Sequence, residues 1–252
     1  MEQKTLEEHK EYLRECTKLG LWAVADWVNK HPQEDIVEVL DERTAIVNHT
    51  VFNNKTLYDF PNFTGDEWPK LKEELKDIYK NSSNPSQFEE LAFKIVEPYI
   101  YGRAEKDLQS INGGNSKSWV RYDLNKDEEY LEIHMENSLY PKSFLADEKY
   151  FYDKLKIAVL DAEKSGFKGL WTCSWLNDLP SWQKLMPKEW NESINNRRWD
   201  FEWHLGFWGQ FLTANQCFNY KLGKKFRETG KIPYPMSRAK ASIEVFKKHL
   251  GI

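Results

Sequence analysis

The sequence predicts an α+β fold in which a mixed sheet with flanking helices follows a mostly helical N-terminal part. Two observations support this prediction. Roughly the first hundred residues carry repeated helix-capping patterns and apolar residues at helical spacing. Further along, a strand, a helix and a second strand follow one another at the spacing of a βαβ crossover, which makes the two strands parallel and adjacent.

The change of character along the chain predicts two parts. Residues 107–118 are polar and contain paired glycines, which is typical of a linker. We therefore expect a helical part with one β-hairpin at 1–106. An α/β domain with an aromatic-rich C-terminal extension is expected at 107–252.

The first helix is expected to begin at Thr5, which forms a capping box with Glu8. It should pause at Gly20 and then continue after a break. Residues 35–52 hold two β-rich runs around the polar triplet 41–43, and this pattern favours a β-hairpin.

Two more helices are expected before the linker. Residues 65–80 have apolar side chains at helical spacing and acids in the first turn. Ser86 and Glu89 repeat the capping box, and Pro98 is expected to end the helix that they start.

The second part opens with segments 118–124 and 128–137, which flank a polar turn and are predicted to form an antiparallel hairpin. From Asp147 a helix with one apolar face should run to Gly166. The apolar run 169–175 then follows as a strand, parallel to the second hairpin strand and next to it.

The C-terminal tail gives weaker signals. Residues 180–190 are expected to form a short helix and 239–251 a terminal one. The sequence pattern of residues 197–235 is compatible with strands and with a helix.

The composition excludes several classes of protein. The formal net charge of −4 over 252 residues argues against a dedicated binder of duplex nucleic acid. A charged N-terminal segment and the lack of an apolar run of about 18 residues predict a cytoplasmic protein that does not bind membranes. Cys16, Cys173 and Cys217 are widely spaced, so neither a disulfide framework nor a cysteine zinc site is expected.

Residues 129–190 contain YLEIHMENSLYP, a helical segment and CSWLNDLPSWQKLMP. This arrangement resembles the C-terminal half of GNAT-like acyltransferase domains, most specifically in Ser174, Trp175, Leu176 and Asp178. The chain is also similar to a group of bacterial and fungal proteins without an assigned activity, which share H-x-x-N-x3-P-x-S-F, S-W-L-N and W-H-x-G-x-W-G-Q-F.

The resemblance implies a GNAT-like mixed sheet in which two parallel strands splay apart and admit the pantetheine arm of an acyl-CoA. A backbone N–H within 134–137 would bind the thioester carbonyl, and the helix that starts near Asp147 would receive the pyrophosphate. Members of the family carry glycines before that helix, whereas this chain has NSLYPKSFLAD. Lys142 and Ser143 could supply a cation and a hydroxyl there, but Asp147 and Glu148 would repel a pyrophosphate. A carrier-protein thioester, an aminoacyl-tRNA and the absence of any acyl donor are therefore alternatives to acyl-CoA.

The predicted reaction is the transfer of an acyl group from an activated, thioester-type donor to an amine. His134 or Glu136 would accept the amine proton, because both alternate on one face of the strand and a histidine titrates near neutral pH. Tyr140 would protonate the leaving thiolate. Polar, aromatic and basic side chains would bind a small-molecule substrate. The predicted substrate-binding residues are Asn137, Lys142, Ser143, Ser174, Asn177, Trp203, His204, Trp208, Gln210 and Arg227.

Two other functions remain open from the sequence. The aromatic wall could grip a small ligand without catalysis. Alternatively, the E-x-H spacing of Glu132, His134 and Glu136 recurs at Glu202 and His204, and the two segments together could surround a metal ion. The sequence does not determine the oligomeric state.

Overall fold

The computed structural model describes residues 4–53, 65–113, 118–122, 129–201 and 205–252. Its contacts divide the chain into two compact units. The sheet unit comprises Asn115–Asp200 and Tyr234–Ile252, and the helical unit comprises Gln3–Gly114 and Phe201–Pro233. The division differs from the predicted one in residues 201–233, which pack with the N-terminal helices.

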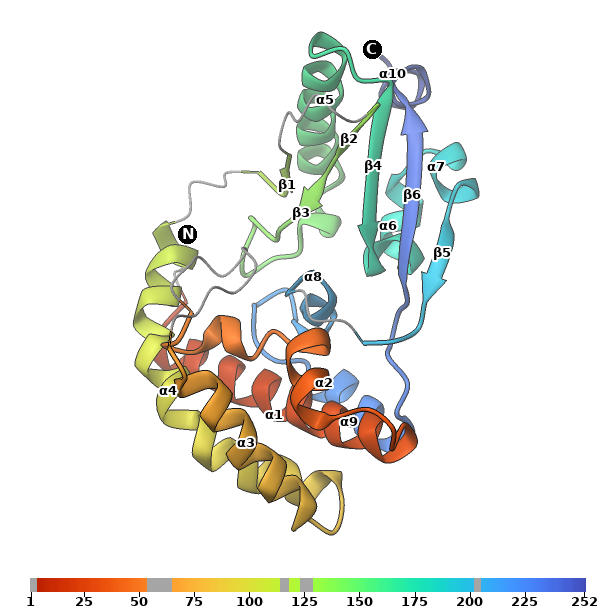
Figure 1. Ribbon diagram of the computed structural model, residues 1–252. Helices are drawn as coiled ribbons and strands as arrows, with labels where there is room; N and C mark the ends of the chain where they lie inside the picture. The colour runs from red at the N-terminus through yellow and green to blue at the C-terminus, as the bar shows by residue number, and fades with distance from the viewer. Residues whose placement is uncertain (1–3, 54–64, 114–117, 123–128, 202–204) are drawn as a thin grey trace. The chain divides into compact units, whose positions relative to one another are not determined.

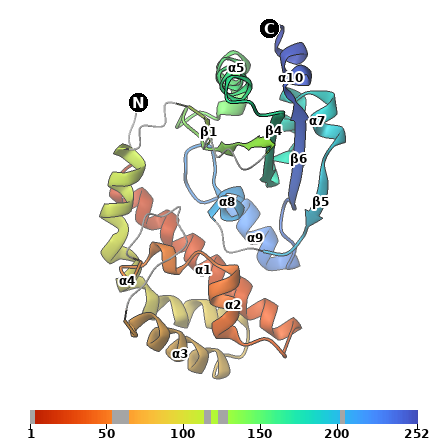
Figure 2. The ribbon, with the colours of Figure 1, turned by 45° about the horizontal axis from the view of Figure 1, so that its top comes forward.

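The helical unit contains α1 (Leu6–Lys30), α2 (Ile36–Arg43), η1 (Val47–His49), α3 (Glu67–Lys80), α4 (Pro85–Gly113), α8 (Leu205–Trp208), η4 (Gly209–Phe211) and α9 (Tyr220–Thr229). The two long helices α1 and α4 pack against each other, and α3 lies beside α4 (Figure 2). The predicted helix at 65–80 is therefore confirmed.

Helix α1 begins as predicted but does not break. The Thr5 side chain accepts from the Glu8 N–H, and the Glu8 carboxylate accepts from the Thr5 N–H, so the capping box is confirmed. Gly20 lies inside the helix, where a Cβ would come within 3.5 Å of the Ile46 side chain. That distance is an ordinary van der Waals contact, and the helix runs through the glycine without interruption, so the predicted break is wrong.

Residues 35–52 form helix α2 and η1, so the predicted hairpin is wrong. The Asp35 side chain accepts from the Val37 N–H at 3.0 Å and starts the helix. Ile36, Val39 and Leu40 are then buried on one helical face. Burial of this face outweighs the strand preference of the β-branched residues.

Helix α4 differs from the prediction at both ends. Asn84 caps it, accepting from the Gln87 N–H at 2.9 Å, so Ser86 is not the capping residue. Pro98 lies inside the helix and is exposed. Water can therefore bind the carbonyl that a proline leaves without a donor, and the helix continues past it.

The sheet unit contains β1 (Val120–Arg121), β2 (Tyr130–Glu132), β3 (His134–Met135), η2 (Phe144–Ala146), α5 (Glu148–Lys164), β4 (Gly169–Ser174), η3 (Trp175–Asp178), α6 (Pro180–Leu185), α7 (Lys188–Glu192), β5 (Asn195–Arg198), β6 (Met236–Ser242) and α10 (Ile243–Leu250). The chain is thus an α+β protein, as predicted. Residues 239–242 belong to β6, so the terminal helix is shorter than expected.

Four strands form a mixed sheet in the order β2-β4-β6-β5, and β1 pairs separately with β3. The predicted parallel pairing of β2 with β4 is confirmed, with Leu131 opposite Leu170, and α5 connects the two strands. The predicted hairpin is confirmed only where Val120 lies opposite Met135. The segment 128–137 is divided between the two sheets at Ile133.

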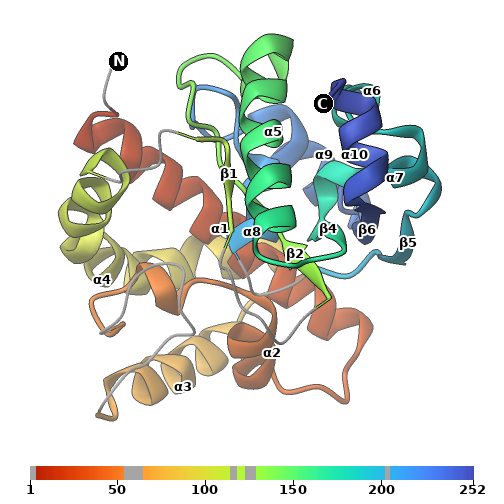
Figure 3. The same cartoon turned by 90° about the horizontal axis from the view of Figure 1, so that it is seen from above.

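All the helices of the sheet unit cover one face of its sheet. Seen down the strands, α5, α6, α7 and α10 lie on the same side of β2, β4, β6 and β5 (Figure 3). Leu131, Leu170 and Ala241 point into this layer and are buried. On the opposite face, Arg238 and Lys240 are exposed. Among the described residues of the sheet unit no helix covers this second face, which we call the open face.

Candidate functional site

The parallel strands β2 and β4 stop pairing after Ile133. The Ile133 N–H donates to Trp171 O at 2.9 Å, which is the last main-chain hydrogen bond between the two segments. The chain then continues as β3, which pairs with β1 and not with β4 (Figure 1). Within the described residues, the two parallel segments therefore separate at their carboxyl ends.

This separation leaves one main-chain donor aimed at β4. The Glu136 N–H donates to Trp119 O at 2.7 Å, on the β1 side. Residues along an antiparallel pair alternate between bonded and non-bonded positions, so Met135, opposite Val120, directs its N–H away from β1. No hydrogen bond between described residues joins this N–H to β4.

The predicted bases lie beyond the end of β2, with His134 in β3 and Glu136 directly after it. Leu131 and Ile133 are buried, and His134 between β2 and the next turn is exposed. The Glu136 carboxylate lies 3.3 Å from the Arg121 guanidinium, with about a third of its side chain exposed (33%). Both side chains can therefore meet a substrate from solvent.

Four other residues predicted for this end of the sheet have structural roles. The Asn137 side chain accepts from the Phe144 N–H at 3.1 Å and closes the turn. Ser143 caps η2, and Ser174 caps η3 by accepting from the Leu176 N–H at 3.2 Å. The Asn177 amide is fully buried and donates to Ser237 O at 2.8 Å.

Two more residues that were predicted for this end of the sheet lie in the turn before α5. Tyr140 is half-buried and Lys142 is exposed. Asp147 caps α5 by accepting from the Tyr150 N–H at 2.9 Å, and Glu148 is in its first turn. The Asp147 carboxylate occupies one N–H group of this helix end and, with Glu148, places negative charge there, which disfavours a pyrophosphate.

The predicted aromatic wall belongs to the helical unit. Trp208 is buried against Phe207, at 5.2 Å between ring centres, and against Phe211 at 5.9 Å. Gln210 is buried and donates to Phe207 O at 3.1 Å. These rings form part of the core. Trp203 and His204 lie outside the described residues.

Arg227 was predicted to bind a substrate anion, but it pairs with Glu89. Its Nε lies 3.0 Å from Glu89 Oε2, and a second nitrogen reaches the other carboxylate oxygen at 2.5 Å. This bidentate pair joins α9 to α4. Burial nevertheless raises the pKa of Glu89 above its usual value, against the effect of Arg227.

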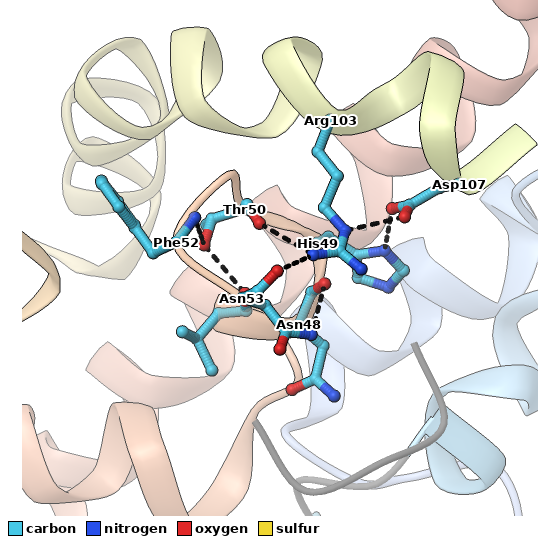
Figure 4. A network of polar contacts seen from close by, with 8 residues as sticks. Asn48, His49, Thr50, Phe52, Asn53, Arg103 and Asp107 are labelled. Atoms are coloured by element: carbon cyan, nitrogen blue, oxygen red, sulfur yellow. Dashed lines mark hydrogen bonds and ion pairs between the residues drawn. The ribbon is translucent and has the colours of Figure 1, made fainter. Parts of the chain in front are cut away.

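The helical unit also holds a buried polar network that the sequence did not predict (Figure 4). Its basis is the docking of the loop after η1 onto α4. The Val51 N–H donates to Tyr99 O at 3.1 Å. At Gly102 a Cβ would come within 2.9 Å of the Val51 side chain, so the glycine permits the close approach.

Arg103 and Asp107, one turn apart on α4, form the centre of this network. The Arg103 Nε donates to Asp107 Oδ1 at 2.8 Å, and both side chains are almost completely buried. Arg103 also donates to Asn53 O. The other Asp107 oxygen, Oδ2, lies 3.5 Å from His49 Nδ1. That distance is too long for a hydrogen bond.

His9, on α1, belongs to the same cluster. It is fully buried, and neither ring nitrogen has a hydrogen-bond partner among the described residues. Burial lowers the pKa of His9 to about 3, and the charge of Lys4 acts in the same direction. His49 Nδ1 and Asp107 Oδ2 are also buried, and neither forms a hydrogen bond within the part of the chain that the structure describes. We call His9, His49 and Asp107 the buried polar cluster.

The buried polar cluster has the components of acid–base chemistry. A carboxylate facing one histidine nitrogen orients the ring and favours proton uptake at the other nitrogen. Buried polar atoms are normally hydrogen-bonded, so four atoms without a hydrogen bond to any described residue would gain from an ordered water or a small polar ligand. A spatial coincidence of residues this far apart has no signal in the sequence.

No protein family, curated protein or solved structure matches this chain. Among the described residues, no helix has the length and apolar character needed to cross a membrane. The same residues include no group of three or more histidines, cysteines and acids placed to hold a metal ion. Glu202, from the predicted metal site, lies outside the described residues.

Proposed function

We propose that the sheet unit transfers an acyl group from a thioester-type donor to an amine. The observation that carries the proposal is the separation of β3 from β4, which leaves the Met135 N–H directed into the space between them. A fixed main-chain donor of this kind stabilises the oxyanion of acyl transfer. The parallel β2–β4 pair and its connecting helix α5 support the same interpretation, because GNAT-like domains are built around such a pair.

The proposed reaction has three steps: attack by the amine, transfer of its proton, and release of the thiolate. The amine nitrogen attacks the thioester carbon and forms the new C–N bond, and the carbonyl oxygen becomes an oxyanion that accepts from the Met135 N–H. His134 takes the proton that the amine loses, directly or through water. The C–S bond then breaks, the carbonyl reforms, and Tyr140 gives a proton to the leaving thiolate. Water returns that proton to Tyr140.

A thiol-release assay tests the proposal. The full chain is incubated with acyl thioesters and a panel of amines, and free thiol is measured by a colorimetric reagent. Amine-dependent release is expected. Combining His134→Ala with Glu136→Gln should lower kcat by about 10²–10⁴-fold, the usual contribution of a general base.

The control variant is Lys156→Ala, a change at an exposed position on the helix α5. It should leave the rate unchanged. Equal turnover by the wild-type protein and the double variant would remove the base assignment. No amine-dependent release with any thioester in the panel would contradict the proposed reaction itself.

A second candidate function is the binding of a small polar molecule in the helical unit. It is favoured by the unpartnered atoms of the buried polar cluster. A thermal-shift screen with amino acids, dicarboxylates and sugars should give at least one compound that raises Tm in the wild-type protein. The same compound should have no effect on a His9→Phe variant that remains folded by circular dichroism. A screen without any such compound would reject this candidate.

A further inference from the structure

Helix α5 carries two exposed apolar side chains in the middle of its outward face. Ile157 is 49% exposed and Leu160 is 42% exposed. The opposite side of the helix packs in the core that covers the sheet (Figure 3). Residues three positions apart are neighbours on a helix, so the two side chains form one apolar spot that faces away from the sheet.

This apolar spot belongs to a seam with the spacing of a coiled coil. The seam consists of Asp153, Ile157, Leu160 and Lys164, which follow one another at intervals of four, three and four residues and are all exposed. Such spacing places the four side chains along one line of the helix. The apolar residues form the centre of this line, and opposite charges lie at its two ends.

We propose that α5 is a dimer interface, which pairs with α5 of a second copy of this chain in antiparallel orientation. A two-fold axis midway between Ile157 and Leu160 places each of these residues against the other one in the second copy. The same axis places Asp153 of each copy against Lys164 of the other. Two ion pairs therefore close the two ends of the apolar centre.

The charges beside the seam are complementary in the same arrangement. In an antiparallel pair of helices, the residues on one side of the seam meet the residues on the same side of the other helix. On the side of Lys154 and Asp161, each lysine then lies opposite an aspartate of the second copy. Asp161 also accepts from the Tyr122 hydroxyl, a bond that leaves its negative charge in place.

A parallel arrangement of the two helices is disfavoured. It would place Asp153 beside Asp153 of the second copy, and Lys164 beside Lys164. Like charges in contact across an interface repel each other and suppress that arrangement. The order of charges along the seam therefore selects the antiparallel dimer.

The ion pair that Asp153 forms within its own chain does not prevent this contact. Asp153 lies 2.8 Å from Lys149, and both side chains are exposed. Ion pairs at the surface contribute little to stability, so Asp153 can exchange this partner for Lys164 of the second copy.

The size of the seam determines how strong the dimer can be. Helix α5 has 17 residues and is about 25 Å long. A standard protein interface uses about 20–30 residues on each side. One face of a single helix supplies fewer, so we expect a weak and reversible dimer.

Sedimentation velocity of the full chain tests the proposal without any turnover. The weight-average sedimentation coefficient should rise with protein concentration between about 10 μM and 1 mM, where a weak dimer assembles. Leu160→Lys should raise the Kd of the dimer by at least about ten-fold, because it removes buried apolar surface from both halves of the interface. A wild-type protein that stays monomeric at about 1 mM would overturn the proposal.

Charge reversal tests the antiparallel arrangement. Asp153→Lys and Lys164→Asp should each prevent self-association, because each variant alone sets two pairs of like charges into the seam. An equimolar mixture of the two variants should associate again, since every such pair then combines opposite charges. If both variants are folded by circular dichroism and their mixture stays monomeric, the proposal is overturned.

The matched control is Leu91→Lys on α4, which changes a leucine of similar exposure (38%) in the helical unit. Self-association should be the same in this variant as in the wild-type protein. Loss of association in Leu91→Lys, together with normal association of Leu160→Lys, would assign the interface to α4 and overturn the proposal.

Discussion

The sheet unit and the helical unit differ in whether their buried polar side chains are hydrogen-bonded. At the carboxyl end of the sheet, Asn137 and Asn177 are engaged in hydrogen bonds with neighbouring segments. What remains for a substrate there is a main-chain N–H and exposed side chains. In the helical unit, His9 and Asp107 are buried with polar atoms that have no partner. A ligand of the helical unit would therefore meet buried donors and acceptors that form no hydrogen bond with the described residues.

The comparison shows that the two units would bind ligands for different physical reasons. A ligand of the sheet unit would gain from donors and charges that are already accessible to solvent. A ligand of the buried polar cluster would instead form hydrogen bonds with buried atoms, which lower the stability of the fold when they have none. Changes to the first region should therefore affect binding and rate, whereas changes to the second should affect stability first.

The largest expected effect comes from breaking the buried ion pair. Arg103→Met leaves the Asp107 carboxylate buried without its cation, and the free energy of unfolding should fall by about 3–5 kcal/mol. Urea denaturation followed by circular dichroism measures it. The matched change in the sheet unit is Arg197→Met, which breaks a pair with Asp178 at 2.7 Å in which the arginine side chain is exposed and the carboxylate is half-buried. That change should cost less than about 1 kcal/mol.

A double variant sharpens this test. Replacing Arg103 by Met and Asp107 by Leu together removes both charges and should cost less than Arg103→Met alone. If the double variant is instead the less stable of the two, the penalty does not come from the uncompensated carboxylate.

The next effect concerns the pH dependence of stability. The pKa of His9 is about 3 in the folded protein, lowered mainly by burial and also by Lys4 and His49, while Asp107 acts in the opposite direction. As the pH falls below about 6.5, the unfolded chain therefore binds a proton at His9 that the folded protein does not. Between pH 7 and pH 5 this residue should lower the free energy of unfolding by about 2 kcal/mol.

Denaturation of the wild-type protein and of His9→Phe at both pH values measures this difference. The variant should lose about that much less stability on acidification. His134→Gln, at an exposed position, serves as the control. Parallel pH curves for the wild-type protein and His9→Phe would show that His9 does not resist protonation.

The smallest expected loss of stability distinguishes a structural residue of the sheet unit, Asn177, from a predicted substrate-binding residue, Lys142. Asn177→Ala leaves the Trp190 indole N–H and Ser237 O without their partner, and the protein should lose about 2 kcal/mol of stability. Lys142→Ala, at an exposed turn position, should change stability by less than about 0.5 kcal/mol. Thermal denaturation compares the two. An Asn177→Ala protein of unchanged Tm would restore this residue as a candidate for substrate binding.

Local signals in the sequence predicted those elements whose ends are set by neighbouring residues. The capping box at Thr5 and the cap of α5 at Asp147 both depend on contacts within four residues. The residues 35–52 were misread, because strand preference and helical burial compete there and only the packed core decides between them. Pro98 was misread for a similar reason, since a proline is tolerated on the wet side of a helix.

For the candidate site, too, the sequence predicted local features and not contacts between distant segments. The sequence predicted His134 and Glu136 on one strand beside a parallel neighbour, but the strand that pairs with β4 ends at Glu132, and His134 lies in β3, which pairs antiparallel with β1. It could not show that Asn177 and Arg227 are already paired, because their partners are 60 and 138 residues away. The buried polar cluster was missed altogether, as His9, His49 and Asp107 share no motif.

The sequence by itself determined the α+β class, the crossover from β2 through α5 to β4, and the alternation of polar and apolar side chains on the strands. These features depend on periodicity and on caps, which act over a few residues. Only the tertiary structure decided where β3 leaves β4, which polar side chains are already paired and which buried atoms have no partner. Those outcomes depend on contacts between distant segments, which form when the core packs and leave no pattern along the chain.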